Sequence, residues 1–142
     1  MNKSKRVFLT AVFLLIFHSS AFAGNRIDLQ RIISIESSGN AKAYNAFSKA
    51  RGLCQITPIC LQEYNNFHNI KYNLADLFNP EINKLIASWY LEIRIPQLLQ
   101  HFKIEATQRN IIICYNAGIG TLTKNKTLKE ETRNYIIKYE KL

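Results

Sequence analysis

Apolar residues recur at helical spacing along most of the chain, and no segment sustains the alternation of an amphipathic strand. The clearest helix signal follows Asn79-Pro80-Glu81, which supplies an N-cap side chain, a proline at the first helical position and an acid in the first turn. The apolar residues beyond it fall three and four positions apart and form one face: Ile82, Leu85, Ile86, Trp89, Tyr90 and Ile93. We predict that this face is core. Pro96 should kink or end the helix, because proline lacks the N–H of the helical ladder.

Three further helices are indicated by the same kind of spacing. They cover residues 26–37, which end at a turn of small residues, residues 107–116, which begin at a threonine cap, and residues 130–140. Residues 41–50 and 62–75 are polar connectors, which we expect on the rim of a groove. The sequence therefore predicts a mainly α protein with a single domain.

The N-terminus has the pattern of a secretory signal peptide. A positively charged head precedes a largely apolar run over residues 7–17, and Ala21-Phe22-Ala23 has the small-x-small pattern of a signal peptidase site. The run is well short of the roughly 20 apolar residues that span a bilayer, so an uncleaved anchor is the weaker interpretation and no stable membrane insertion is expected. We predict that residues 1–23 are removed and that residues 24–142 are a periplasmic or secreted catalytic domain.

The charge balance is strongly basic. Removing the leader takes three positive charges and no negative ones from the net charge of +9, which leaves +6. Such an excess suits an anionic partner, namely a cell-wall polymer, a membrane surface or nucleic acid, although a merely soluble surface fits as well. The basic residues spread from Arg26 to Lys141, with a mild excess after Lys124. This spread argues against a nucleic-acid groove, so no nucleic acid is expected as a partner.

The three cysteines leave two interpretations open. Cys54, Cys60 and Cys114 could form one disulfide with one thiol left over in an oxidising compartment, or all three could be small buried residues. Their spacing does not match a zinc site, and no histidine accompanies them. No metal is expected.

Glu36 is the candidate for acid–base chemistry. It lies at the predicted C-terminus of a helix beside Ile33 and Ile35, and both the negative end of the helix dipole and an apolar wall disfavour a carboxylate. A carboxylic acid held protonated near neutral pH can protonate a leaving oxygen and then act as a base. On local sequence alone, a solvated surface glutamate is the simpler interpretation.

Five short motifs, read together in their order along the chain, favour a catalytic role for Glu36 over a solvated surface position. They are Glu36-Ser37, Gly52-Leu53-x-Gln55-Ile56-x-Pro58, Asn79-Pro80-Glu81-x-Asn83, Tyr115-Asn116-Ala117-Gly118 and Glu131-Thr132-Arg133-x-Tyr135. Together they resemble the soluble lytic transglycosylase family, whose catalytic domain is similar to goose-type lysozyme. The resemblance runs from about residue 27 to residue 139. It implies cleavage of the β-1,4 bond between N-acetylmuramic acid and N-acetylglucosamine in peptidoglycan without water, giving a 1,6-anhydro ring.

The resemblance also implies a mechanism with one carboxylate and no cofactor. One glutamate acts as acid and then as base, while the acetamido group of the substrate stabilises the intermediate, a known exception to the usual pair of carboxylates. We interpret four acids without a matching motif as surface residues: Asp28, Glu63, Asp76 and Glu92.

Residue roles follow from the matching positions. The resemblance implies that Glu36 is the catalytic acid and base, that the Tyr115 hydroxyl orients it, and that Asn116 shapes the same wall. It implies that Gln55 hydrogen-bonds sugar and that Glu131 reaches a bound saccharide, although Tyr115 could be a core tyrosine and Glu131 a plain helix-start charge. Two further positions complete the expected groove: Gly52, where the backbone approaches closely, and Ser48, for the serine that the family has near this point.

The chain departs from the family pattern at three places. Cys54 stands where methionine is usual, and Cys114 stands where alanine is usual, so a Cys54–Cys114 bridge across the site is a hypothesis. The stretch Ala43–Ser48 differs from the family in spacing.

The sequence thus predicts a small exported lytic transglycosylase that acts on peptidoglycan glycan strands as a monomer. Two alternatives stay open: a hydrolytic muramidase with the same cleft, and a wall-binding or assembly factor on an inactivated lysozyme fold. The bare domain resembles the specialised transglycosylases that open the wall locally for a secretion, conjugation or pilus apparatus, although a general recycling enzyme or a phage-derived enzyme would look similar.

Overall fold

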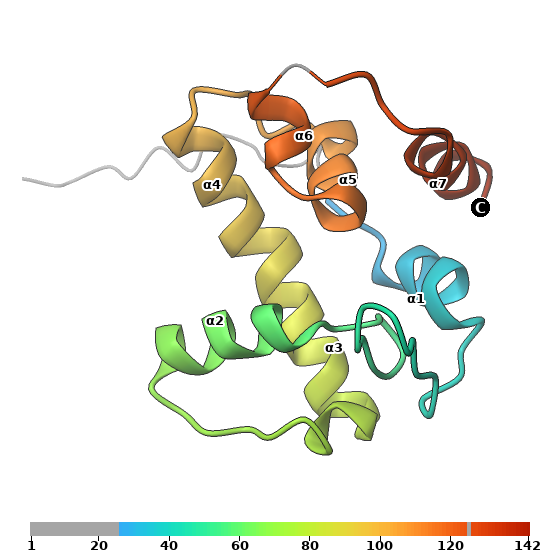
Figure 1. Cartoon of the computed structure of the whole chain (residues 1–142), viewed down its shortest axis with the longest axis vertical. Helices are drawn as coiled ribbons and strands as arrows, with labels where there is room; N and C mark the ends of the chain where they lie inside the picture. The colour runs from blue at the N-terminus through green and yellow to red at the C-terminus, as the bar shows by residue number, and fades with distance from the viewer. Residues whose placement is uncertain (1–25, 125) are drawn as a thin grey trace, which may run out of the picture.

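The computed structural model describes residues 26–124 and 126–142, and the regular elements in these residues are helices (Figure 1). In chain order they are α1 (Leu29–Ser37), α2 (Pro58–His68), a 3-10 turn η1 (Asp76–Phe78), α3 (Pro80–Trp89), a π-helical turn η2 (Tyr90–Arg94), α4 (Ile95–His101), α5 (Gln108–Ala117), α6 (Gly120–Thr123) and α7 (Glu130–Lys141). The prediction of a mainly α, single-domain fold is confirmed. The predicted leader, residues 1–23, lies outside the described residues.

Helices α3 and α4 and the turn η2 between them form one long continuous rod, and other helices pack against it (Figure 1). Helix α2 packs on α3 near one end of the rod, and α5 packs on α4 near the other (Figure 1). The rod does not end at Pro96, which is the second residue of α4, where a missing N–H costs little. The ladder is instead disturbed just before it, because in η2 the N–H of Ile95 bonds the carbonyl of Tyr90, five residues back.

The buried face of α3 differs in part from the predicted one. Ile86 and Trp89 are in the core, as expected, but Leu85 is 50% exposed and Ile93 is 42% exposed. Leu85 lies about 100° around the helix from Ile86, on the flank of the buried face. The residue that completes this face is polar: the side chain of Asn83 is fully buried.

Asn83 fastens the residues 51–57, called here the 51–57 loop, to the rod. Its side-chain oxygen accepts from the backbone N–H of Cys54 at 2.8 Å, and its nitrogen donates to the carbonyls of Arg51 and Leu77, each at 2.8 Å. Gly52 makes this contact possible: it has φ +78°, and a Cβ there would collide with the Leu77 carbonyl and the Asn83 amide. The expected close backbone approach at Gly52 is therefore present, and it is an approach to the rod.

Two predicted helix starts are confirmed, and two helices were missed, namely α2 and the short α6. The side chains of Asn79 and Thr107 cap α3 and α5 by accepting backbone N–H groups of the first turn. The prediction of a connector over residues 62–75 is wrong at its beginning, because α2 extends to His68. Its asparagine-rich exposed side hid a buried face, which consists of Cys60, Leu61 and Tyr64.

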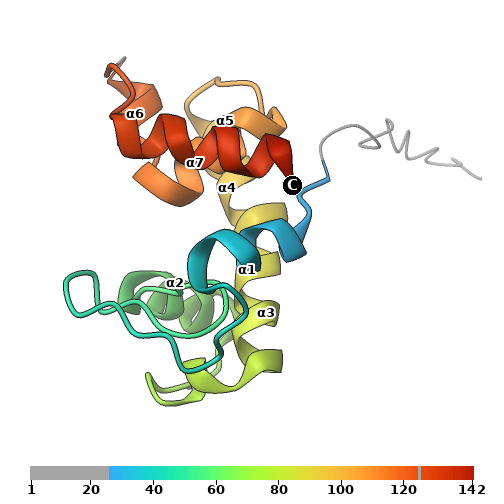
Figure 2. The same ribbon diagram turned by 90° about the vertical axis from the view of Figure 1, so that its right-hand side faces the viewer.

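Helices α1 and α7 lie against each other although they stand at opposite ends of the described chain (Figure 2). The Tyr139 hydroxyl and the backbone N–H of Asp28 are 2.7 Å apart, and the Arg31 guanidinium donates to the Tyr139 carbonyl at 2.9 Å. This packing brings the first half of α7 toward the C-terminal end of α1. Within residues 26–124 and 126–142, no helix has both the length and the apolar character needed to cross a membrane.

Candidate active site

Glu36 is the second-last residue of α1, and the end of that helix is tied to the 51–57 loop. The helix stops where Ser38 adopts a left-handed conformation with φ 52°. The Ser37 hydroxyl donates to the carbonyl of Leu53 at 2.7 Å. The carboxyl of Glu36 is thereby held at the edge of a cavity that the loop also lines.

This cavity has a volume of about 490 Å³, and of the seven positions expected in the groove, all except Gly52 line it. They come from separate segments of the chain: Glu36, Ser48, Gln55, Tyr115, Asn116 and Glu131. Several further lining residues were not assigned to the site from the sequence, among them Asn45, Phe47, Thr57 and Tyr90. Tyr90 opens η2, and because the sequence places it on an apolar helical face, no sequence signal distinguishes it from a core residue.

Burial raises the pKa of Glu36 from its ordinary value to about 7. The hydrogen bond from Tyr135 lowers this pKa, and repulsion by the nearby carboxylate of Glu131 raises it. The direction matches the sequence expectation, but the structure adds Glu131 as a cause. A carboxyl with a pKa near 7 is available in both protonation states at neutral pH, as an acid–base catalyst requires.

The tyrosine bonded to Glu36 is Tyr135, and the expectation that Tyr115 plays this part is corrected. The Tyr135 hydroxyl donates to Oε1 of Glu36 at 2.7 Å, whereas the Tyr115 hydroxyl donates to the carbonyl of Cys54 at 2.6 Å. The Tyr115 hydroxyl thus satisfies a backbone acceptor of the 51–57 loop. Burial raises the pKa of both phenols well above the usual range, so they are hydrogen-bond donors at neutral pH.

Tyr135 could have been found from its spacing to Glu131. Residues four apart lie on one face of a helix, so Glu131 and Tyr135 of α7 approach the same region. What the sequence could not give is which helix end this face meets. The packing of α7 on α1 supplies that answer (Figure 2).

Gln55 and Ser48 line the cavity from the loops that lead to α2, and Gln55 has a left-handed backbone conformation. Gln55 has φ 51°, and its side-chain nitrogen donates to the Gly52 carbonyl at 3.1 Å, which leaves the amide oxygen and the second N–H available to a ligand. The Ser48 hydroxyl accepts from the N–H of Ala50 at 3.3 Å. Both polar groups therefore have fixed starting positions at the cavity wall.

All three cysteines are buried free thiols in the structure, so the hypothesised Cys54–Cys114 bridge is not formed. Burial raises the pKa of Cys54 to about 12 and that of Cys114 to about 11. The pKa of Cys60 is raised as well, by the same cause. These thiols pack as small apolar residues, which is the second of the two interpretations of the sequence. Among the described residues, no group of three or more potential metal ligands is brought together.

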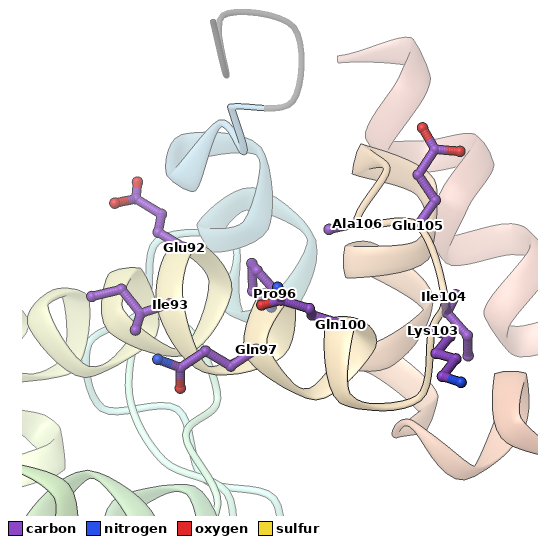
Figure 3. A pocket seen from close by; sticks show the side chains of 9 residues that line it. All are labelled: Glu92, Ile93, Pro96, Gln97, Gln100, Lys103, Ile104, Glu105 and Ala106. Carbon is purple, nitrogen blue, oxygen red and sulfur yellow. The ribbon is translucent and has the colours of Figure 1, made fainter. Parts of the chain in front are cut away.

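A separate cavity of about 640 Å³ lies beside η2, α4 and the segment that leads to α5 (Figure 3). Its acids, Glu92 and Glu105, are at opposite ends of it, and none of the predicted site residues lines it (Figure 3). The chemistry expected from the sequence is therefore concentrated at the Glu36 cavity.

The mainly helical fold and a partly buried, protonatable glutamate at a cavity agree with the lysozyme-like class of glycan-cleaving proteins. Residues 16–137 match the family model described as Transglycosylase SLT domain, so the chain belongs to the SLT transglycosylase family. No curated protein and no solved structure gave a significant match. Members of this family are lytic transglycosylases, lyases that act on the glycosidic bonds of peptidoglycan, and this activity and substrate apply to the chain at the level of the family.

Proposed function

We propose that Glu36 cleaves the bond between N-acetylmuramic acid and N-acetylglucosamine, first as general acid and then as general base. The protonated carboxyl gives its proton to the glycosidic oxygen while the bond from that oxygen to C1 of the muramoyl sugar breaks, and the N-acetylglucosamine end leaves as an alcohol. The carboxylate then takes the proton of the muramoyl 6-hydroxyl as that oxygen bonds to C1. The product is a 1,6-anhydro ring, and Glu36 is protonated again.

The observation that carries this proposal is the pKa of about 7 of a cavity-lining carboxyl with a fixed hydrogen-bond partner. Both half-reactions use the same group in opposite protonation states, so a pKa near the working pH serves both. Tyr135 positions the carboxyl and stabilises its ionised form, while burial and Glu131 favour the protonated form. No metal or organic cofactor takes part in these steps.

Hydrolysis by the same cavity is the second candidate, and Glu131 is the observation that favours it. This carboxylate lines the cavity together with Glu36. An inverting glycosidase uses a second carboxylate to activate water on the opposite face of the sugar. In that case, the product carries an ordinary reducing end in place of the anhydro ring.

Mass spectrometry of the soluble products from purified peptidoglycan tests both candidates. The wild-type protein should release fragments one water lighter than hydrolysis products, and Glu36→Gln should release none. Glu131→Gln should keep the anhydro products, and Glu92→Gln, a matched change in the separate cavity, should behave like wild type. Products with ordinary reducing ends that disappear in Glu131→Gln would establish the muramidase. A folded wild-type protein that releases nothing would favour a wall-binding or assembly factor.

The proposal includes export and a cellular setting. Residues 1–23 act as a cleaved leader, which delivers residues 24–142 to the periplasm or the exterior, where the substrate lies. The protein works there as a monomer that opens the wall locally for a secretion, conjugation or pilus apparatus, an extension that rests on the resemblance alone. N-terminal sequencing of the exported protein should begin at Gly24.

A further inference from the structure

A second cavity, of about 330 Å³, adjoins the catalytic one. It is bounded by the end of α5, by α6, by residues 126–129 and by the first turn of α7. Asn116 and Glu131 line both cavities, so the two hollows share an edge. The second cavity is therefore the immediate neighbour of the Glu36 cavity across Asn116 and Glu131.

The lining of the second cavity suits an anion. Lys126 and Lys129 contribute two ammonium groups, against the single carboxylate of Glu131 on the shared edge. The ion pairs of the described residues use other cations, so neither lysine has its charge neutralised by a neighbouring acid. Hydroxyl groups of Thr121 and Thr127 add hydrogen-bonding capacity beside them.

The backbone of both lysines is anchored to neighbouring helices. The backbone N–H of Lys126 donates to the carbonyl of Thr121 at 3.2 Å, and Lys129 is the residue directly before α7. Their side chains are exposed, as those of a binding surface must be. The mild excess of basic residues noted after Lys124 in the sequence is in part explained by this cavity.

The chemistry of the substrate indicates which anion belongs here. The sugar whose C1 reacts at Glu36 is the muramoyl residue, and its lactyl ether carries the peptide stem, which is rich in carboxylates. The stem must leave the catalytic cavity close to the reacting carbon. We infer that the second cavity binds the peptide stem of the muramoyl residue being cleaved, with Lys126 and Lys129 paired to stem carboxylates. The preferred substrate is then stem-bearing glycan, and this inference rests on the proposed placement of the chemistry at Glu36.

Binding of two forms of one glycan tests the inference. Soluble strands with intact stems are compared with the same strands stripped by an amidase that removes the stems. The protein carries Glu36→Gln, so that bound strands are not consumed. Two exposed ion pairs should give the stem-bearing strands an affinity about 2- to 30-fold higher, and this ratio should shrink at high salt.

Two double variants that remove the same net charge distinguish binding in the second cavity from a general effect of charge. K126Q/K129Q should bring the affinity ratio close to one. K138Q/K141Q removes the same charge from the exposed far end of α7 and should leave the ratio as it is. Circular dichroism confirms that each variant is folded.

Two results would overturn the stem site: equal affinity of the starting protein for both strands, or an equal loss of the ratio in both double variants. Failure of the proposed function has a different signature. A wild-type protein that binds stem-bearing strands preferentially but never cleaves them would refute the chemistry at Glu36 and support the stem site.

Discussion

The two sides of the catalytic cavity are built from different kinds of interaction. On one side, the 51–57 loop is held through its backbone, because Ser37, Asn83 and Tyr115 all bond main-chain groups of the loop. On the other side, α7 acts on the carboxyl of Glu36 itself, through the hydroxyl of Tyr135 and the charge of Glu131. The first side fixes the shape of the cavity, and the second sets the protonation of the acid.

This difference teaches that chemically similar residues can have separable roles here. Tyr115 and Tyr135 donate short hydrogen bonds within one region, yet Tyr115 donates to a carbonyl and Tyr135 to a carboxyl. Substitutions on the loop side should therefore change stability and geometry. Substitutions on the α7 side should change pH dependence.

The largest expected effect is the loss of the loop's anchor in Asn83→Ala. The variant leaves buried backbone groups of Arg51, Cys54 and Leu77 without these partners, so unfolding free energy should fall by about 3–5 kcal/mol. Urea denaturation measures it. Asn79→Ala, the same chemical change at the exposed N-cap of α3, should cost only about 1 kcal/mol. Equal losses in the two variants would show that Asn83 is no special anchor.

A pH-dependent effect of comparable size is expected from Glu36→Gln. The folded-state pKa of Glu36, about 7, lies above the unfolded value, so the folded wild type binds the extra proton between pH 4.5 and 7 and loses stability as the pH rises through this window. Glutamine cannot ionise, so the unfolding free energy of the variant does not decrease for this reason as the pH rises. The variant should gain about 3 kcal/mol relative to wild type between pH 4 and pH 8, in denaturation curves taken across that range. A difference that does not vary with pH would contradict the raised pKa.

Changing Tyr135 or Tyr115 to phenylalanine should affect different properties, namely the pH dependence of activity in one case and the stability in the other. Because the Tyr135 hydrogen bond lowers the pKa of Glu36, Tyr135→Phe should move the alkaline limb of the kcat/KM profile to higher pH. Tyr115→Phe should leave that limb in place and lower the unfolding free energy by about 1–2 kcal/mol, since it leaves the Cys54 carbonyl without this donor. The profiles would contradict this assignment if Tyr115→Phe moved the limb and Tyr135→Phe did not.

Glu131→Gln should give the smallest effect. Its charge raises the pKa of Glu36, so removing it should shift the alkaline limb to slightly lower pH. Because Glu131 is exposed, the shift should shrink as ionic strength increases. Activity profiles at low and high salt measure it. A shift that is insensitive to salt would point to a contact role for Glu131.

Structural features that depend only on residues close together in the chain could be predicted from the sequence. The caps at Asn79 and Thr107 depend on side chains within the same turn, and five of the residues that line the cavity belong to recognisable motifs: Glu36, Gln55, Tyr115, Asn116 and Glu131. The roles of Tyr115 and Tyr135 could not be assigned, because the bond from Tyr135 to Glu36 joins residues 99 positions apart and depends on how α7 packs on α1. The buried role of Asn83 was missed for the same reason: local periodicity does not show which backbone groups of a distant loop need a partner.

The most direct test of the account is a ¹³C NMR titration of the Glu36 carboxyl, assigned by comparison with Glu36→Gln. The account predicts a midpoint at about pH 7 in the wild-type protein and a higher midpoint in Tyr135→Phe. A wild-type midpoint near the ordinary glutamate value of about 4.3 would contradict it, because Glu36 would then be ionised at neutral pH and could not serve as the acid.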